Sequence, residues 1–149
     1  AVEVCLKLRL SLKVVGVGPM VEDLKKLVGS NSNIEFLGAV DDEQLARLYA
    51  GAKALLYPVE DEDFGMVPIE SMMAGTPVIA HNSGGPRYTV KREINGILFD
   101  QLDLQGLEQA VKEFKKMSFD SEKIAAATHV YTKKEFEKRI KDFTEISTN

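Results

Sequence analysis

The chain has 149 residues, of which 44% are hydrophobic and 28% are charged, which is typical of one globular domain with a sizeable core. A net charge of −4 and the scatter of Lys and Arg along the chain argue against nucleic-acid binding. A single cysteine and two histidines exclude an internal disulfide and a zinc site of several thiolates, and no apolar run approaches the ~18 residues of a membrane span.

The first ten residues have the pattern of the end of an amphipathic helix. They do not resemble a signal peptide, because Glu3, Lys7 and Arg9 interrupt every apolar run. Because the chain does not begin with Met and starts within a helical pattern, we expect it to be a fragment of a longer polypeptide. The elements predicted after this helix are strand 12–17, a helix up to 28, loop 29–33, strand 34–37, helix 41–50, strand 54–57, helix 65–74, strand 76–80, turns 83–86 and 95–96, strand 97–99, and helices 104–117, 121–128 and 133–146.

Strand and helix patterns alternate from residue 12 to residue 99. This alternation predicts right-handed β-α-β units, and therefore an α/β fold with a Rossmann-like parallel sheet and helices on both faces. Residues 1–149 are expected to form a single domain whose C-terminal segment, about 104–149, is helical. Ligands of such sheets bind beyond the carboxyl ends of the strands. The loops expected there are 16–19, 38–40, 58–64 and 82–86.

The stretch from Glu62 to Glu70, EDFGMVPIE, joins the third predicted strand to a helix. Pro68 places the start of that helix near Gly65 or Met66, because proline is tolerated only in the first turn. The backbone N–H groups of Gly65, Met66 and Val67 then have no partner within the helix. Together with the helix dipole they form an anion site, for which phosphate is the usual ligand.

The two glutamates of this stretch occupy different places. Glu62 lies on the loop before the helix, whereas Glu70 lies about one turn inside it, on a helical stripe with Met66, Ile69 and Met73. A carboxylate on an apolar stripe must find hydrogen-bond donors or raise its pKa, and a sugar diol supplies two donors. The competing interpretation is structural, with Glu70 capping a neighbouring loop and Glu62 acting only as a favourable charge near a helix start.

Three other features have weaker chemical interpretations. Gly16-Val-Gly-Pro resembles the start of a dinucleotide fingerprint, but the third glycine is missing, so a tight strand-to-helix turn is favoured over an NAD site. Asp61-Glu62-Asp63 contains Asp-x-Asp, a pattern that elsewhere binds a divalent ion; because the helix N-terminus already neutralises phosphate, we expect neither a metal nor a cofactor. His81 and His129 are expected at the core edge or the surface.

The segment from 58 to 86, PVEDEDFGMVPIESMMAGTPVIAHNSGGP, resembles the donor site of the group 1 (family 4) retaining glycosyltransferases, which have the GT-B fold. The resemblance covers roughly residues 12–100 and includes the flanks VVGVGP and NGILFD. Within the family, the sequence of this segment looks most like that of the mannosyltransferases. The matching positions are Glu62, Phe64, Gly65, Glu70, Met73, Gly75, Pro77, Val78, Ile79, Ala80, Gly84 and Gly85.

This resemblance implies the C-terminal, nucleotide-sugar-binding half of a two-domain enzyme, truncated at its N-terminal edge. The enzyme would transfer a hexose, with mannose favoured, from a nucleotide-diphospho-sugar to a glycan or lipid-linked acceptor held by the missing N-terminal domain. The full-length parent would be cytoplasmic or peripheral to a membrane, and the fragment alone inactive. The implied roles are catalysis by Glu62; sugar contacts from Asp63 and Phe64; diphosphate binding by Gly65, Met66 and Val67; ribose binding by Glu70; and a base site lined by Leu37, Gly38, Ala39 and Val40.

The chain also departs from the family pattern. The Arg and Lys that neutralise the departing diphosphate belong to a first strand-loop-helix that this sequence lacks, and Tyr88 stands where a Glu often follows the Gly-Gly turn. Two alternatives stay open. One is half of a nucleotide-sugar epimerase, which would need histidines near the anomeric centre, and the other is a non-catalytic nucleotide-binding module.

Overall fold

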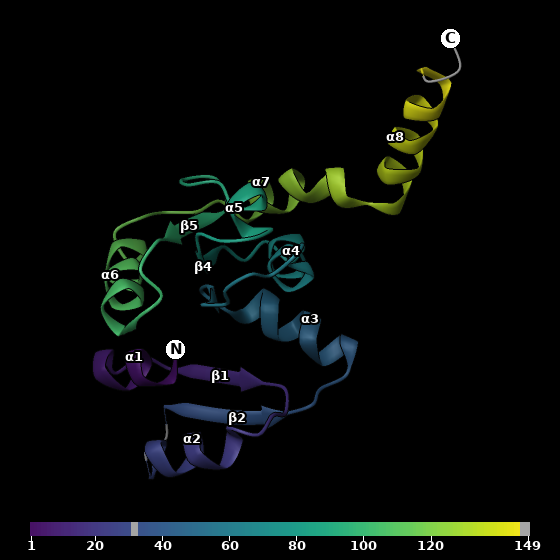
Figure 1. The fold of residues 1–149 in the computed structure, drawn as a ribbon. Coiled ribbons are helices and arrows are strands. Elements are labelled where there is room, and N and C mark those ends of the chain that lie inside the picture. Colours follow the sequence, from purple (N-terminus) through teal and green to yellow (C-terminus); the bar gives the residue numbers. More distant parts are fainter. Residues whose placement is uncertain (31–32, 147–149) are drawn as a thin grey trace.

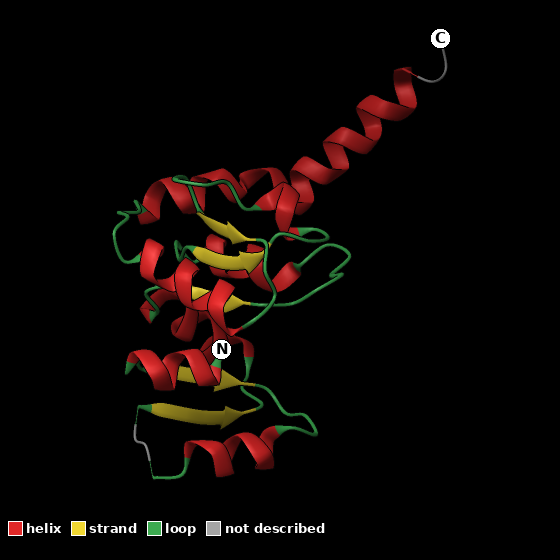
Figure 2. Cartoon of the chain, turned by 60° about the vertical axis from the view of Figure 1, so that its left-hand side comes forward, coloured by secondary structure: helices red, strands yellow, loops and turns green. Residues whose placement is uncertain are grey.

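The computed structural model describes residues 1–30 and 33–146, and it has the predicted α/β organisation (Figures 1 and 2). Most predicted elements are present within two residues of their expected ends; the expected loop 29–33 lies partly outside the described residues. The elements are α1 (Val2–Leu8), β1 (Leu12–Val15), α2 (Val21–Val28), β2 (Ile34–Gly38), α3 (Asp42–Gly51), β3 (Leu55–Tyr57), α4 (Met66–Met73), β4 (Val78–His81), α5 (Pro86–Thr89), β5 (Gly96–Phe99), α6 (Leu104–Phe114), α7 (Ser121–Ala127), the 3-10 helix η1 (Thr128–Tyr131) and α8 (Lys133–Ile146).

All strand pairs are parallel, as predicted, but the strands form two sheets instead of one. β1 pairs with β2, and the second sheet has the order β3-β4-β5. The strands of both sheets run in the same direction in Figure 2, so their carboxyl ends lie at one edge of the molecule. The short helix α5, which follows the predicted turn 83–86, was not predicted from the sequence.

Helices cover both faces of the three-stranded sheet, which confirms the predicted layering. On one face Ile79 and Ile97 belong to a buried cluster completed by residues of α1 and α6. On the other face Val78 and Ala80 pack with residues of α4 and α7. All four residues of β4 are buried because this central strand is covered on both sides, which is typical of parallel sheets.

The C-terminal helix α8 projects from the body of the molecule (Figures 1 and 2). Its main contacts are with η1, and the side chains of Phe136, Ile140 and Phe143 are exposed. Among the described residues, no helix is long and apolar enough to cross a bilayer.

Two neighbouring methionines of α4 provide a test of this packing. Met72 is fully buried between α4 and β4, whereas Met73 is 53% exposed. Met72→Ala should lower the free energy of unfolding by ~2–5 kcal/mol because it removes buried methylenes and leaves a cavity. Met73→Ala, the control, should change it by no more than ~0.5 kcal/mol. Urea denaturation of both variants measures the difference, and equal losses would contradict the described orientation of α4.

Candidate functional site

The N-terminus of α4 lies at the carboxyl edge of the sheets, where ligands of parallel sheets bind. Gly65 is the residue before the first helical turn and has a φ of 81°, a left-handed conformation that favours glycine. Met66 and Val67 begin the helix, and Pro68 follows them in the first turn, as predicted. The side chains of Met66 and Val67 are exposed, whereas Gly65 itself is buried, so solvent reaches the first turn at Met66 and Val67.

Glu62 is held in place by two hydrogen bonds. Its Oε2 accepts a bond of 2.9 Å from the Tyr57 hydroxyl, and its Oε1 accepts a bond of 3.3 Å from the Gly65 backbone N–H. Burial, and then the bond to Glu62, raise the pKa of Tyr57 to about 12, so at neutral pH this phenol stays protonated and donates. One of the three N–H groups expected to bind phosphate therefore contacts Glu62 in this structure, although the contact is long for such a bond.

Glu70 faces helix α3. Its Oε2 accepts a hydrogen bond of 3.2 Å from the Tyr49 hydroxyl, and burial, followed by the charge of Glu70, raises the pKa of Tyr49 to about 12. The helical stripe that contains Glu70 was predicted to be apolar surroundings for its carboxylate, and this was wrong in one respect. Ile69 is buried, but Met66 and Met73 are exposed, so Glu70 lies at the border of the solvent-facing side of α4. The buried face of this helix is instead turned by one position, toward residues 68, 69, 71 and 72.

The turn after β4 holds the loop that carries Glu62. The Gly85 N–H donates a bond of 2.7 Å to the Glu62 carbonyl. The Ser83 hydroxyl accepts a bond of 3.3 Å from the Asp61 N–H, and its oxygen lies 3.4 Å from the Val59 carbonyl oxygen. A Cβ on Gly84 would lie 2.0 Å from the Glu62 carbonyl oxygen, so this close approach requires glycine. Sequence reasoning identified the turn but missed its role as the support of the loop.

The rest of the loop is exposed, and one of its residues has an unusual backbone conformation. Asp61 has a φ of 55°, a left-handed value that is uncommon for residues other than glycine. Asp63 and Phe64 are exposed, and the Phe64 ring meets the Tyr131 ring of η1 edge to face, with centroids 6.1 Å apart. This contact between the C-terminal segment and the loop was not predicted, because nothing in the local sequence of Tyr131 indicates it.

The residues predicted to line the base lie at the end of β2. Leu37, Gly38 and Val40 are half-buried and Ala39 is exposed. The Gly38 carbonyl accepts a bond of 2.7 Å from the Gly16 N–H, which brings the loop after β2 together with the loop after β1. These loops and the Glu62 loop all follow carboxyl ends of strands, so they share one edge of the molecule (Figure 2).

The histidines and acids do not assemble a metal centre in the part of the chain that the structure describes. The buried His81 has Nδ1 3.0 Å from the Ser83 hydroxyl and Nε2 3.2 Å from the Asp100 carbonyl oxygen. Both ring nitrogens are therefore engaged in hydrogen bonds that join β4, the turn after it and the end of β5. His129 lies in η1. These contacts agree with the core-edge position expected for His81.

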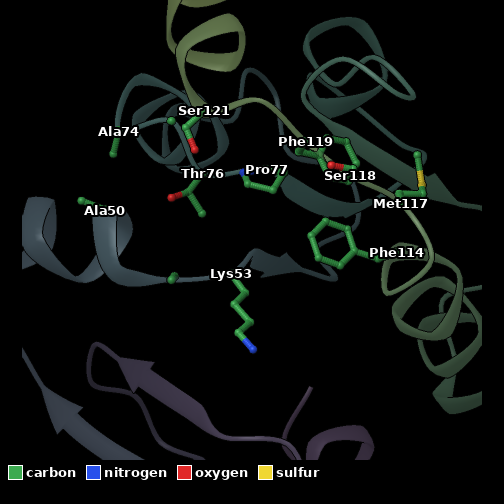
Figure 3. Close-up of a pocket in the computed structure, with 12 residues that line it drawn as sticks. Ala50, Lys53, Ala74, Thr76, Pro77, Phe114, Met117, Ser118, Phe119 and Ser121 are labelled. Atoms are coloured by element: carbon green, nitrogen blue, oxygen red, sulfur yellow. The ribbon is translucent and has the colours of Figure 1, made fainter.

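A pocket of about 380 Å3 lies at the opposite edge (Figure 3). Lys53 precedes β3, and Thr76 and Pro77 precede β4, so the pocket is at the amino ends of the strands. Apart from Lys53 its lining carries no charged side chain. It is therefore separate from the loops that the sequence identified as a binding edge.

The chain matches the family model described as "Glycosyl transferases group 1" over residues 2–135. A glycosyltransferase of Methanocaldococcus jannaschii is 39% identical over 89 residues, which cover 58% of this chain and 23% of that protein. A GDP-mannose-dependent phosphatidylinositol monomannoside mannosyltransferase of Mycobacterium tuberculosis is 34% identical over 113 residues, covering 69% of this chain and 29% of its own length.

Solved structures of glycosyltransferases share the fold. The lipopolysaccharide outer core galactosyltransferase WaaB has a TM-score of 0.79 at 19% identity, covering 91% of this chain and 41% of its own. Anabaena HepE, solved with UDP-glucose, has a TM-score of 0.63 at 20% identity, covering 87% and 39%. The chain thus spans about a quarter of the two sequence relatives and two fifths of these structures. Its fold is that of part of a GT-B glycosyltransferase, and the chain belongs to the group 1 glycosyl transferases.

Proposed function

We propose that this chain binds the nucleotide-diphospho-sugar donor of a retaining hexosyltransferase. The observation that carries the proposal is the first turn of α4, exposed at Met66 and Val67, between two carboxylates, Glu62 and Glu70, each of which accepts a hydrogen bond from a tyrosine hydroxyl. The names of two similar proteins support the ligand class, since one is GDP-mannose-dependent and another was solved with UDP-glucose.

The diphosphate binds to the start of α4. The N–H groups of Met66 and Val67 occupy the first two helical positions, so neither has a partner within the helix. The helix dipole adds favourable electrostatic interaction with an anion, worth ~0.3–1 kcal/mol at an exposed helix end. The Gly65 N–H joins them when a phosphate oxygen replaces its long contact with Glu62. No metal ion is needed for this part of the binding.

The sugar binds next to Glu62. When the bond between the anomeric carbon and the diphosphate breaks, positive charge develops on the sugar ring. A carboxylate that is already oriented by Tyr57 stabilises that charge without having to reorganise. The exposed side chains of Asp63 and Phe64 contact the sugar from the same loop. The acceptor then attacks from the face that the diphosphate leaves, so the configuration at the anomeric carbon is retained.

The nucleoside binds through Glu70 and the loop after β2. Tyr49 engages Oε2 of Glu70, so Oε1 is available to accept hydrogen bonds from the ribose hydroxyls. Residues 37–40 line the base. Mannose is favoured as the hexose by the mannosyltransferase relative, and a glycan or lipid-linked acceptor binds to another part of the enzyme.

The epimerase alternative has less support. It requires a histidine near the anomeric centre, but the ring nitrogens of His81 are hydrogen-bonded to Ser83 and Asp100. A non-catalytic nucleotide-binding module differs from the proposal only in turnover. The 149-residue chain alone is expected to bind the donor without transferring sugar.

Loss of Glu70 should weaken binding of the nucleotide itself. Because a hydrogen bond to a charged group contributes ~1.5–3 kcal/mol, Glu70→Ala should raise the Kd for GDP or UDP by roughly 10- to 150-fold. Titration calorimetry of the chain with GDP, UDP and ADP, in EDTA and then in magnesium, measures it. Glu60→Ala, at an exposed position earlier in the same loop, is the control. An unchanged Kd would make Glu70 structural, and binding that needs magnesium would overturn the metal-free site.

Loss of the Glu62 charge should affect the chemical step. In an enzyme that includes the acceptor-binding part, Glu62→Gln keeps the shape of the side chain and removes its charge. The effect should appear as a fall in kcat of roughly 100-fold or more with KM for the donor changed little, since the charge acts mainly in the transition state. Steady-state kinetics with Glu60→Gln as the control test this split. A Glu62→Gln enzyme with a normal kcat and a poor affinity for the donor would show that Glu62 contributes to binding of the donor in its ground state and not to the chemical step.

A further inference from the structure

The buried His81 is hydrogen-bonded through both ring nitrogens, and the two partners fix which nitrogen carries the hydrogen. Nε2 lies 3.2 Å from the Asp100 carbonyl oxygen, and Nδ1 lies 3.0 Å from the Ser83 hydroxyl. Because a carbonyl oxygen only accepts hydrogen bonds, Nε2 must be the protonated nitrogen. In the neutral imidazole Nδ1 is then an acceptor, so the Ser83 hydroxyl donates to it.

The distances around Ser83 agree with this direction. Its hydroxyl has one hydrogen and two possible acceptors, His81 Nδ1 at 3.0 Å and the Val59 carbonyl oxygen at 3.4 Å. Since a hydroxyl hydrogen bond to oxygen is ordinarily ~2.5–3.0 Å long, the Val59 contact is too long to compete. The lone pairs of the Ser83 oxygen accept the Asp61 N–H at 3.3 Å. A chain of hydrogen bonds thus runs from the loop, through Ser83, to the buried ring.

The core holds the ring in place. His81 is the last residue of β4, the central strand, whose four residues are all buried. The Phe99 ring at the end of β5 packs against the imidazole, with centroids 5.7 Å apart. The bond from Nε2 to Asp100 fixes the other side of the ring. His81 is therefore an anchor in the core, and Ser83 connects it to an exposed loop.

Asp61 is the loop residue that depends on this connection. Its φ of 55° is a left-handed value, which is strained for a residue other than glycine. Glu62 follows it directly, and the Glu62 carbonyl oxygen accepts the Gly85 N–H at 2.7 Å. The turn after β4 thus holds the strained residue from both sides. Without the bond to Ser83, Asp61 can relax to a commoner conformation, and that rotation changes the direction of the Glu62 side chain.

We propose that His81 is a positioning residue for glycosyl transfer, acting through Ser83 and Asp61 on the Glu62 carboxylate. As the Nε2–H tautomer it accepts a hydrogen bond from the Ser83 hydroxyl, and so presents the serine oxygen to the Asp61 N–H. Because His81 is buried, it acts on the donor only through these residues. This inference rests on the catalytic role of Glu62 in the proposed function.

The tautomer of His81 is tested in the 149-residue chain without ligand. Long-range 1H–15N correlation spectra of the imidazole distinguish the Nε2–H tautomer, the Nδ1–H tautomer and the imidazolium, and His129→Gln assigns the two histidines. We expect the Nε2–H tautomer near neutral pH, with a shift of Nδ1 in Ser83→Ala as its donor is lost. An Nδ1–H tautomer or an imidazolium would overturn the proposal, because in either form the ring donates to Ser83.

A double-mutant cycle tests the link to Glu62 in an enzyme that includes the acceptor-binding part. Ser83→Ala should lower kcat by roughly 10- to 100-fold with little change in KM for the donor, since small displacements of a catalytic group have effects of this size. Ser83→Thr, which keeps the hydroxyl, should restore much of kcat. In a Glu62→Gln background, Ser83→Ala should lower kcat by less than about 2-fold, because both changes remove the same interaction.

Two further variants separate this role from general stability. His81→Phe keeps a buried ring without its nitrogens and should lower kcat as Ser83→Ala does; the Ser83 variants decide if it does not fold. Ser71→Ala is the matched control, because this buried hydroxyl also donates to a carbonyl, that of Thr76, but toward the far end of α4. Its kcat should stay within about 2-fold of the parent. Urea denaturation shows that each variant is folded.

Failure of this inference and failure of the proposed function give different results. A normal kcat for Glu62→Gln would contradict the proposed function. A low kcat for Glu62→Gln with a normal kcat for Ser83→Ala would overturn only the positioning role of His81 and Ser83. The same conclusion would follow if the losses from Glu62→Gln and Ser83→Ala multiplied in the double variant.

Discussion

The close approach of two backbone segments is the constraint on which the site depends. Gly84 and Gly85 lie so near the loop after β3 that a Cβ on either would be 2.0 or 2.1 Å from a carbonyl oxygen, that of Glu62 or Phe64. Such distances exclude any side chain, so the turn after β4 and the Glu62 loop form one unit. The position of the Glu62 carboxylate follows from this contact. It reaches back to Tyr57 at the end of β3 and forward to the start of α4, and it is thus oriented by elements of the core.

The same arrangement gathers negatively charged side chains where an anionic diphosphate is proposed to bind. Asp61, Glu62 and Asp63 crowd the positive end of the α4 dipole, which stabilises acids but also attracts the diphosphate of a donor. A bound diphosphate beside these carboxylates needs compensating cations. In the proposed donor complex these cations are Lys or Arg side chains outside the loop that carries Glu62.

Local sequence signals predicted the local structure well. Pro68 located the start of α4, and the alternation of apolar runs with helical patterns predicted the parallel sheets. Periodicity alone could not orient α4, because a helical stripe shows which residues share a face and not which face meets the sheet. Other features could not be predicted from local patterns, because they depend on residues distant in sequence or on how strands pair. These are the hydrogen bonds from Tyr57 and Tyr49 to the two glutamates, the Phe64–Tyr131 contact and the division of the strands into two sheets.

The central claim is that a nucleotide diphosphate binds at the N-terminus of α4, at the carboxyl edge of the strands. Mapping amide chemical shifts of the 15N-labelled chain during titration with GDP and UDP in EDTA tests it most directly. The account predicts saturable shifts of the Met66 and Val67 amides, with smaller shifts in the loop after β2. Shifts confined to the pocket at the opposite edge, around Gly75 and Phe119, would contradict it.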